Sequence, residues 1–346
     1  MQSQSTMKHP DPSHIMQVGT GFWASKTLLA AVKFGLFTLL TDKQMSAEEI
    51  RKDLSLHKRS IYDFLDTLVS LGFLNREGLK EKAVYSNSPD TGLFLDKNKP
   101  SYIGGLLEMC NERLYKFWGS LEEGLQTGKP QNEVKLTGHS MFEALYADPE
   151  RVEQFMKAMA GIQMGAFMAF AKSFNFKPYK TLCDMGGATG ALSIQVALNN
   201  LHMQCTSFDL PAVAHVTKKW IELFHVQDRV KPASGDFFKD EFPKADIITM
   251  GNILHDWGYD GKLKLTSSAY KALPDDGAFV IIENIIDDDR RQNVFGLLMS
   301  LNMLIETEEG YDFSFSDFKE IAAKAGFKRF ELLPLAGPTS AAIAYK

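Results

Sequence analysis

The sequence predicts an α/β protein whose carboxyl-terminal half is a mostly parallel sheet with helices on both faces. The first observation is the alternation of strand-like and amphipathic stretches after Lys180, which is typical of a parallel sheet covered by helices. The second is a glycine-rich turn, Gly186–Gly190, between the first strand and its helix. The third is a pair of strand-like segments joined by Gly337-Pro338 without a helix, which predicts a closing antiparallel hairpin.

We expect three regions along the chain: residues 1–97, residues 98–175 and residues 176–346. The first has the pattern of a winged helix, with short helices followed by a small β element. Its expected features are the capping box Ser46–Glu49, the helix Ser60–Leu71, and the strands Phe73–Arg76 and Ala83–Ser86. The second region is predicted to be helical and the third to contain the sheet.

The winged-helix pattern leaves two uses open, because such domains bind DNA or pair with another subunit. The candidate recognition helix begins with Lys58 and Arg59 but also carries Asp63 and Asp66. Phosphate contact needs a basic stripe, and this helix is nearly neutral with a wide apolar face. Pairing with a second copy of the chain is therefore favoured over a DNA-binding regulator.

The helical region contains a methionine-rich stripe that includes Met159. Core packing is the ordinary role of such a stripe. Because methionine adapts to the shape of its neighbours, the stripe is alternatively a lining for a flat apolar ligand.

The carboxyl-terminal region is predicted to hold seven strands. Helices are expected between the first five, for example over Ala191–Asn199 and Gly261–Ala272. The predicted strands are Thr181–Met185, Gln204–Asp209, Arg229–Ala233, Ala245–Met250, Ala278–Glu283, Phe327–Leu333 and Ala341–Tyr345.

Composition excludes several classes of function. The chain of 346 residues has a net charge of −5, so no global basic field favours nucleic acid. Its three cysteines lack metal-ligand spacing, which predicts free thiols in a reducing compartment and no metal. We found no signal peptide and no run of 18 apolar residues, so we expect a cytoplasmic protein without membrane contact.

Acidic residues recur where successive predicted strands end. Asp184 precedes the double glycine, Asp209 ends the second strand, and Asp236-Phe237 follows the third. Ligands of parallel sheets bind beyond the carboxyl ends of the strands. An acid at Asp209 can accept both ribose hydroxyls, and an acid beside an aromatic ring suits an adenine. Taken singly, each acid has a helix cap or a turn as its alternative reading.

The spacing within the glycine turn distinguishes between nucleotide cofactors. A dinucleotide fingerprint requires G-x-G-x-x-G, and Met185 stands where its first glycine should be. An NAD-dependent oxidoreductase is therefore disfavoured. An acid before a double glycine fits a ligand with hydroxyls and a cationic head, although an ordinary tight turn remains the alternative.

His255 is the one histidine, among eight, predicted to stand at the end of a strand. The ordinary pKa of histidine, about 6.5, suits a group that accepts a proton near neutrality. Glu283, which ends the next strand, and Asp312 are the two carboxylates available to orient the imidazole. The spacing does not choose between them.

Four motifs in combination resemble the class I S-adenosylmethionine-dependent methyltransferases, which have a Rossmann-like seven-stranded sheet. The motifs are Asp184–Gly187, Phe208–Pro211, Gly235–Phe238 and Leu254–Trp257. The resemblance covers nearly the whole chain. It is closest to small-molecule O-methyltransferases with a winged-helix dimerisation domain, and Ser300–Leu304 is similar to the acetylserotonin (hydroxyindole) branch.

The resemblance implies a role for each matching residue. His255 would be the general base, with Glu283 and Asp312 beside it. The residues implied to bind S-adenosylmethionine, or its product S-adenosylhomocysteine, are Asp184, Gly186, Gly187, Gly190, Asp209, Leu210, Asp236, Phe237 and Asn252. The residues implied to lie near the methyl acceptor are Met159, Asp256, Met299, Asn302 and Met303, with Phe22 and Trp23 contributed by the partner of a homodimer.

Three positions depart from the family pattern. Ala188 replaces a frequent third glycine, Gly251 stands where plant members carry lysine, and Asn252 stands where the vertebrate acetylserotonin enzyme has arginine. The last two positions face the acceptor pocket, so they put the acceptor in doubt and leave the cofactor assignment intact.

The function expected from the sequence is therefore methyl transfer to a hydroxyl of a small, in the first instance aromatic, molecule. The same cofactor site would also serve sulfur, nitrogen or carbon acceptors. Because Gly251 and Asn252 are not basic, methylation of a small thioether acid is the main alternative within this chemistry.

Overall fold

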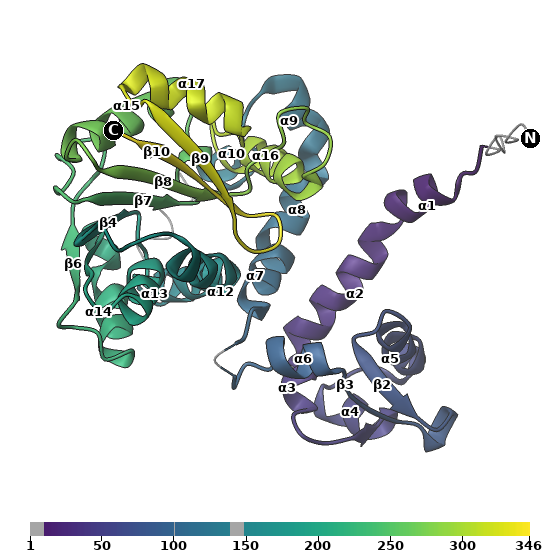
Figure 1. Ribbon diagram of the computed structural model, residues 1–346. Helices are drawn as coiled ribbons and strands as arrows, with labels where there is room; N and C mark the ends of the chain where they lie inside the picture. Colours follow the sequence, from purple (N-terminus) through teal and green to yellow (C-terminus); the bar gives the residue numbers. More distant parts are fainter. Residues whose placement is uncertain (1–9, 100, 139–148) are drawn as a thin grey trace, which may run out of the picture. The chain divides into compact units, whose positions relative to one another are not determined.

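The computed structural model describes residues 10–99, 101–138 and 149–346. By its internal contacts the chain divides into two compact units, residues 1–112 and 113–346 (Figure 1). The division into regions 1–97, 98–175 and 176–346 stays a prediction. Within the described residues, none of the helices has the length and apolar content needed to cross a bilayer.

The first unit is mostly helical and contains a small antiparallel sheet in the order β1-β3-β2. β2 and β3 form the predicted wing, with Arg76 opposite Tyr85. The two-residue strand β1 was not predicted. The elements are α1 (Ser13–Gly19), α2 (Gly21–Phe34), α3 (Leu36–Leu39), β1 (Met45–Ser46), α4 (Ala47–Asp53), η1 (Lys58–Ser60), α5 (Ile61–Ser70), β2 (Leu74–Glu77), η2 (Lys80–Lys82), β3 (Val84–Asn87), α6 (Pro89–Phe94) and α7 (Gly104–Met109).

Local signals in this unit act as the sequence predicts. The Ser46 hydroxyl accepts the Glu49 N–H, and the Glu49 carboxylate accepts the Ser46 N–H at 2.8 Å, so both halves of the capping box are present. The apolar face of α5 buries Leu65 and Leu68 in a core that also contains Tyr85. This core is separate from those of the second unit.

The second unit is built on a seven-stranded sheet in the order β6-β5-β4-β7-β8-β10-β9. The first five strands in this order are parallel, and β10 is antiparallel to both of its neighbours. This is the predicted parallel sheet with a closing hairpin. The strands are β4 (Thr181–Met185), β5 (Gln204–Asp209), β6 (Val230–Ser234), β7 (Ile247–Gly251), β8 (Ala278–Glu283), β9 (Arg329–Pro334) and β10 (Ser340–Tyr345).

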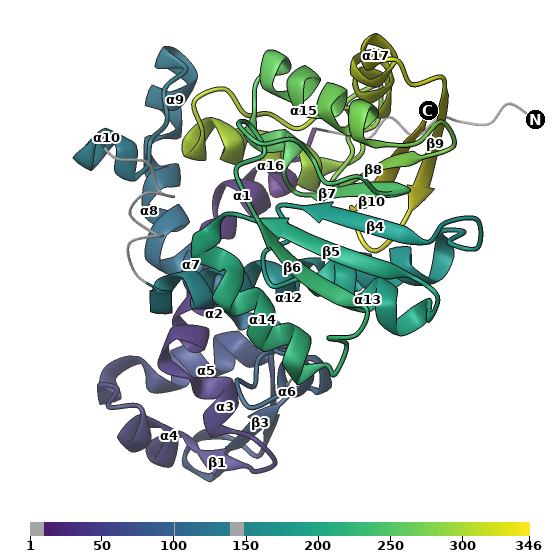
Figure 2. The ribbon, with the colours of Figure 1, turned by 90° about the vertical axis from the view of Figure 1, so that its left-hand side faces the viewer.

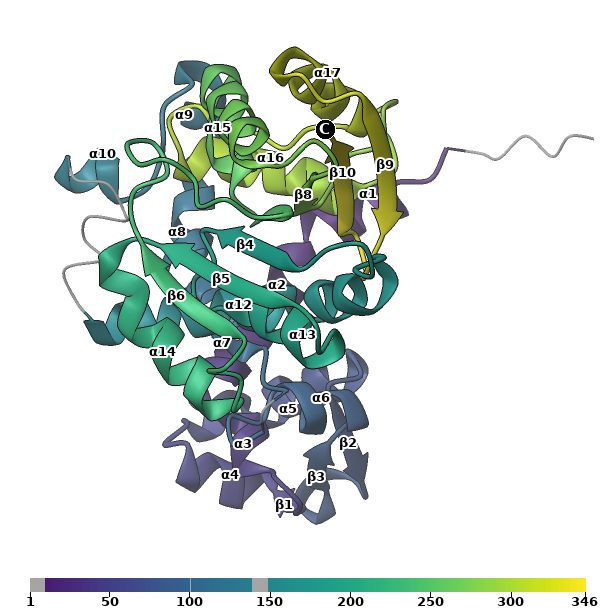
Figure 3. The ribbon, with the colours of Figure 1, turned by 60° about the vertical axis from the view of Figure 1, so that its left-hand side comes forward.

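Helices cover both faces of this sheet, with α12, α13 and α14 on one and α15 and α17 on the other (Figures 2 and 3). Short helices precede α12, and η3 is a π-helical turn at the boundary between the units. The helical elements are η3 (Cys110–Leu114), α8 (Tyr115–Phe117), η4 (Trp118–Ser120), α9 (Leu121–Thr127), α10 (Glu133–Thr137), α12 (Pro149–Ser173), α13 (Ala191–Asn199), η5 (Pro211–Val213), α14 (Ala214–Leu223), η6 (Leu254–Asp256), α15 (Tyr259–Ala272), α16 (Val294–Glu306) and α17 (Phe315–Ala325).

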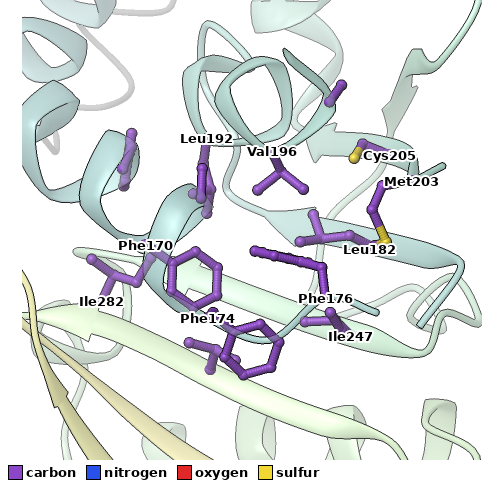
Figure 4. Close-up of a cluster of buried hydrophobic side chains, with 14 of the residues drawn as sticks. Phe170, Phe174, Phe176, Leu182, Leu192, Val196, Met203, Cys205, Ile247 and Ile282 are labelled. Atoms are coloured by element: carbon purple, nitrogen blue, oxygen red, sulfur yellow. The ribbon is translucent and has the colours of Figure 1, made fainter. Parts of the chain in front are cut away.

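Aromatic packing fixes α12 against the sheet. Phe170, Phe174 and Phe176 form a buried group with ring centroids 4.9–5.4 Å apart (Figure 4). They pack on Leu182 of β4 and Val196 of α13 within one hydrophobic cluster. The cluster thus packs α12 and α13 on β4, the strand that leads into the glycine turn.

Candidate active site

Five parallel strands place the predicted acids at one edge of the sheet. β6, β5, β4 and β7 are neighbours, so the segments that follow them lie side by side. This edge has two parts. One is the glycine turn with Asp209 and Asp236, and the other is the turn after β7 with His255.

The glycine turn is tied to β5 by its own backbone. The N–H groups of Gly186 and Gly187 donate to the Phe208 carbonyl at 2.8 and 3.1 Å. Gly186 has a φ of +74°, and a side chain there would clash with Ile253. Glycine is therefore required both by the backbone conformation and by the packed neighbour.

Asp209 accepts two backbone hydrogen bonds. Its Oδ2 accepts the Ala188 N–H at 2.8 Å, and its Oδ1 accepts the Leu210 N–H at 2.7 Å. Burial raises the pKa of Asp209, and these two hydrogen bonds oppose that shift. Each oxygen retains a second lone-pair direction, so the carboxylate is held in place while it can still accept from a ligand.

Asp184 lies behind the turn. It is 3% exposed, and its Oδ1 accepts the Thr249 hydroxyl at 2.8 Å. Burial raises the pKa of Asp184 to about 7. This carboxyl therefore titrates near neutrality.

Asp236 is more exposed than the other two acids. Its Oδ1 accepts the Phe238 N–H at 2.9 Å, and its Oδ2 pairs with Lys239 at 2.7 Å. The hydrogen bond from Lys239 lowers the pKa of Asp236. Phe237 lies edge-on to Trp257, with ring centroids 6.2 Å apart. The Phe237 ring also borders the glycine turn.

A cavity of about 40 Å³ adjoins the glycine turn on the side of α12. Met159 belongs to its lining, together with Gln163 and Phe167. A side chain at Gly251 would approach Phe167 to 3.1 Å. This small space lies between α12 and the glycine turn.

Asn252 follows β7 with a φ of +51°, a left-handed conformation that is uncommon for a residue with a side chain. Its N–H donates to the Ile282 carbonyl at 3.1 Å. The strained residue turns the chain from β7 into η6, and this turn places His255.

His255 is 5% exposed and has two carboxylates near its ring. Nδ1 lies 3.4 Å from Oδ1 of Asp312, and Nε2 lies 3.6 Å from Oδ1 of Asp256. Both separations exceed a good hydrogen bond. These are charge contacts rather than aligned hydrogen bonds.

Glu283 acts on the backbone of the same turn. Its Oε1 accepts the N–H groups of Ile253, Leu254 and His255 at 3.2, 2.8 and 3.3 Å. The two carboxylates that the sequence left as alternatives thus differ in their contacts. Asp312 faces the imidazole, and Glu283 holds the turn that carries it.

In this cluster the pKa of His255 differs from the ordinary histidine value of about 6.5 on which the sequence prediction was based. Burial lowers the pKa of His255, but Glu283, Asp312 and Asp256 together outweigh burial and raise it to about 10. Burial also raises the pKa of Glu283 to about 7. The surrounding carboxylates therefore favour the cationic form of the imidazole.

Several polar atoms of this cluster are buried without a hydrogen-bond partner. They are His255 Nδ1, Glu283 Oε2, and both carboxylate oxygens of Asp312. The three side chains can bring one atom each within 4.8 Å of the others, which is compact enough for a cation. The nearby ammonium of Lys262 opposes a divalent ion, and the expectation of no metal stays a prediction.

The residues predicted to contact the acceptor are spread over several elements. On α16, Met303 is buried and Met299 half-buried, and the Oδ1 atom of Asn302 accepts the Trp118 indole N–H at 2.9 Å. Phe22 and Trp23 belong to α2 of the other unit and are both exposed.

Sequence analysis missed two residues of this region, Lys262 and Trp118. Lys262 shares a helical face with Leu265 and Ala269, which are buried, and this spacing was a usable signal for a buried lysine. Nothing in the sequence indicated that Trp118 bonds to Asn302.

Comparison with known proteins agrees with this geometry. Residues 118–328 match the O-methyltransferase domain, and residues 16–97 match the O-methyltransferase dimerisation domain. The chain belongs to the O-methyltransferase family with an N-terminal dimerisation domain. It is an S-adenosylmethionine-dependent O-methyltransferase of small molecules.

Individual relatives extend the match to nearly the full length. The chain is 35% identical over 335 residues to the tetracenomycin polyketide synthesis 8-O-methyl transferase TcmO of Streptomyces glaucescens, which covers 97% of both chains. It is 31% identical over 314 residues to the N,N-dimethyltransferase OxyT of Streptomyces rimosus, with 91% and 90% covered. The crystal structure of human N-acetylserotonin methyltransferase in complex with SAM has a TM-score of 0.88 at 26% identity and covers 99% of both chains. The predicted likeness to the acetylserotonin branch is thereby confirmed.

Proposed function

We propose that this enzyme methylates a hydroxyl of a small aromatic molecule, with His255 as the general base. The observation that carries the proposal is the position of His255. It is buried on the turn after β7, next in the sheet to the glycine turn after β4, and lies 3.4 Å from Asp312. A base that meets the cofactor at one sheet edge is what methyl transfer to a hydroxyl requires.

The residues around the glycine turn fit S-adenosylmethionine by their chemistry. Asp209 has lone pairs left for two ribose hydroxyls, and Asp236 with Phe237 suits the adenine amino group and ring. The buried carboxyl of Asp184 and the turn Gly186–Gly190 fit the amino-acid end, with Leu210 and Asn252 beside them. Met185 in place of a first glycine argues against a pyrophosphate.

When bound, S-adenosylmethionine supplies a methyl group that its sulfonium already activates. His255 takes the proton of the acceptor hydroxyl at an imidazole nitrogen. A phenol has an ordinary pKa near 10, which matches the raised pKa of His255. Proton transfer to a neutral imidazole is therefore nearly balanced, but a raised pKa leaves fewer imidazoles neutral at pH 7. Turnover should consequently rise with pH.

The acceptor is bounded by residues on α16 and α12. Asn302, held by Trp118, offers polar contact beside Met299 and Met303, and Met159 lines the cavity by the glycine turn. This mixture suits a flat, partly polar molecule. A nitrogen acceptor is the second candidate, because OxyT is an N,N-dimethyltransferase by name. A thioether acid also remains in the test panel.

We further propose that the protein is a homodimer formed through its N-terminal unit. The large exposed apolar side chains of α1 and α2 are Ile15, Met16, Val18, Phe22, Trp23 and Phe34. So many apolar side chains on two consecutive helices are typical of an interface. In such a dimer, Phe22 and Trp23 are candidates for contact with the partner's acceptor.

The test is calorimetric titration with S-adenosylhomocysteine, followed by a methyl-transfer panel of phenols, hydroxyindoles, amines and thioethers. We expect micromolar affinity for S-adenosylhomocysteine, none for NADH, and turnover of a phenolic or hydroxyindole member that is unchanged by a metal chelator. Exclusive turnover of an amine or a thioether would contradict the hydroxyl acceptor. Failure to bind S-adenosylhomocysteine would contradict the cofactor site.

A further inference from the structure

Lys262 is a fully buried lysine behind the His255 turn. It lies on α15 and is 0% exposed. Its Nζ donates to the Trp257 carbonyl and lies 3.6 Å from the centroid of the Tyr311 ring and 5.4 Å from that of Phe313. A lysine is almost never buried without a partner, because its charge loses the solvation of water.

These contacts join two separate segments of the chain. Trp257 directly follows His255 and Asp256, whereas Tyr311 and Phe313 stand on either side of Asp312. The lysine thus holds the turn that carries the imidazole against the loop that carries the carboxylate facing it. Both cation–π contacts are desolvated, where such contacts are strongest.

The ammonium also lies within the electrostatic reach of the carboxylates around His255. Burial lowers the pKa of Lys262, and Glu283, Asp312 and Asp256 oppose that shift. Among the residues described, three carboxylates of this cluster face two basic groups. These carboxylates therefore favour the cationic forms of both His255 and Lys262.

The charged side chains of the neighbouring helix α17 have their partners outside this cluster. α17 packs against α15, but Lys324 pairs with Glu320 at the surface, and Asp317 caps α17 by accepting the Ser314 N–H at 2.8 Å. The group that balances the carboxylates from the side of α15 is Lys262.

We propose that Lys262 is a positioning residue for methyl transfer. Its buried ammonium joins the His255 turn to the Asp312 loop and offsets part of the carboxylate charge, so that the imidazole can release its proton and act as a base. This inference rests on the proposed role of His255. Neither the family match nor the sequence motifs assign Lys262 a part.

The consequence of losing this charge has a definite sign. Without the ammonium, the carboxylates stabilise cationic His255 more strongly, so its pKa rises and less of it is neutral at any given pH. One buried charge within a shared cluster shifts a neighbouring pKa by about one unit or more. At pH values well below both pKa values the loss should be about constant, and it should shrink only as the pH rises past the pKa of the imidazole in the variant.

The first experiment is the pH profile of kcat/KM for Lys262→Met, which keeps the length of the side chain and removes its charge. We expect the acid limb to move to higher pH by about one unit or more, with turnover at pH 7 lowered about tenfold or more. Lys271→Met, on the exposed face of the same helix, is the matched control and should keep the native profile. An acid limb that stays in place, with a loss that persists undiminished above it, would show that Lys262 only packs, and would overturn the proposal.

A double variant keeps the test decisive if the single variant folds poorly. Lys262→Met with Glu283→Gln removes one charge of each sign, and glutamine retains an oxygen for the Leu254 N–H. We expect its acid limb to return toward the native position. An acid limb of the double variant that lies about one pH unit or more above the native one would count against charge balance.

A third measurement separates this inference from the proposed function. The NMR titration of the His255 ring, identified by its absence in His255→Asn, reads the imidazole pKa without turnover. We expect a higher value in Lys262→Met than in the native protein. An unchanged value would overturn the role of Lys262, whereas unimpaired methyl transfer by His255→Asn would overturn the base and leave the titration result standing.

Discussion

The two parts of the sheet edge use carboxylates in opposite ways. Around the glycine turn, Asp209 and Asp236 accept backbone N–H groups and remain partly accessible. Around the turn after β7, Glu283 and Asp312 are each 1% exposed and keep oxygens without a hydrogen-bond partner. The first arrangement suits recognition of ligand hydroxyls and amines, and the second keeps charge out of water beside a group that titrates.

This difference predicts which property a substitution in each part of the sheet edge will change. A hydrogen-bonded, accessible acid contributes a bounded binding energy, of the order of a few kcal/mol. Buried charges act on one another over several ångströms because little water screens them. Substitutions near the glycine turn should therefore change affinity, and those near His255 should change rate and pH dependence.

The largest expected effect is that of His255→Asn. Asparagine keeps a polar group but cannot act as a base, so turnover should fall about 10²- to 10⁴-fold. The affinity for S-adenosylhomocysteine should stay within about twofold, because the ring belongs to the other part of the edge. Steady-state kinetics measures the turnover, and calorimetry measures the affinity for S-adenosylhomocysteine. A loss of affinity parallel to the loss of turnover would contradict the division of the sheet edge into a binding part and a catalytic part.

The second prediction concerns stability. Because the pKa of His255 is raised from its ordinary 6.5 to about 10, its protonation stabilises the folded state fully below pH 6.5, and this contribution is lost as the pH rises toward 10. The free energy of unfolding should therefore fall across this window by a few kcal/mol. Urea midpoints at several pH values should show a flatter dependence in His255→Asn. Identical slopes in both proteins would mean that the imidazole is not held cationic.

A smaller effect is expected from Asp209→Asn. The amide oxygen can keep one backbone N–H, but the charge that accepts ribose hydroxyls is lost. The affinity for S-adenosylhomocysteine should fall about 10- to 100-fold, with the acid limb of the pH profile unmoved. Asp228→Asn, at an exposed position, is the control. A shifted pH profile with unchanged affinity would contradict the assignment of Asp209 to cofactor binding at the glycine turn.

The smallest effect should come from Asp236→Asn. The amide oxygen can still accept the Phe238 N–H, and the exposed pair with Lys239 contributes at most about 1 kcal/mol. The affinity for S-adenosylhomocysteine should therefore fall less than about fivefold. A loss as large as that of Asp209→Asn would show that exposure is a poor guide to the importance of these acids.

Regular, fully buried strands were the most predictable part of the fold. The predicted bounds of Ala278–Glu283 agree with β8 because both faces of the strand are buried, and its apolar run ends at a charged residue. The strand β1 was missed because two residues carry no periodicity. It exists only through pairing with β3, which lies about forty residues along the chain.

The site was predictable where a topological rule applied. Strand ends of a parallel sheet meet at one edge, so Asp209, Asp236 and His255 could be placed together from the sequence. The choice between Glu283 and Asp312 could not be made, since it depends on how the loop before α17 returns to the sheet, where Ile286 pairs with Ser314. Lys262 was missed because lysines are normally exposed.

Glu283 combines two tasks in one side chain, and this limits how the enzyme can be altered. Its carboxylate both accepts the N–H groups of the η6 turn and contributes charge to His255. An engineer who replaces it changes the placement and the basicity of the imidazole together. Asp312 faces the imidazole itself, so tuning the enzyme toward more or less acidic acceptors should begin with Asp312.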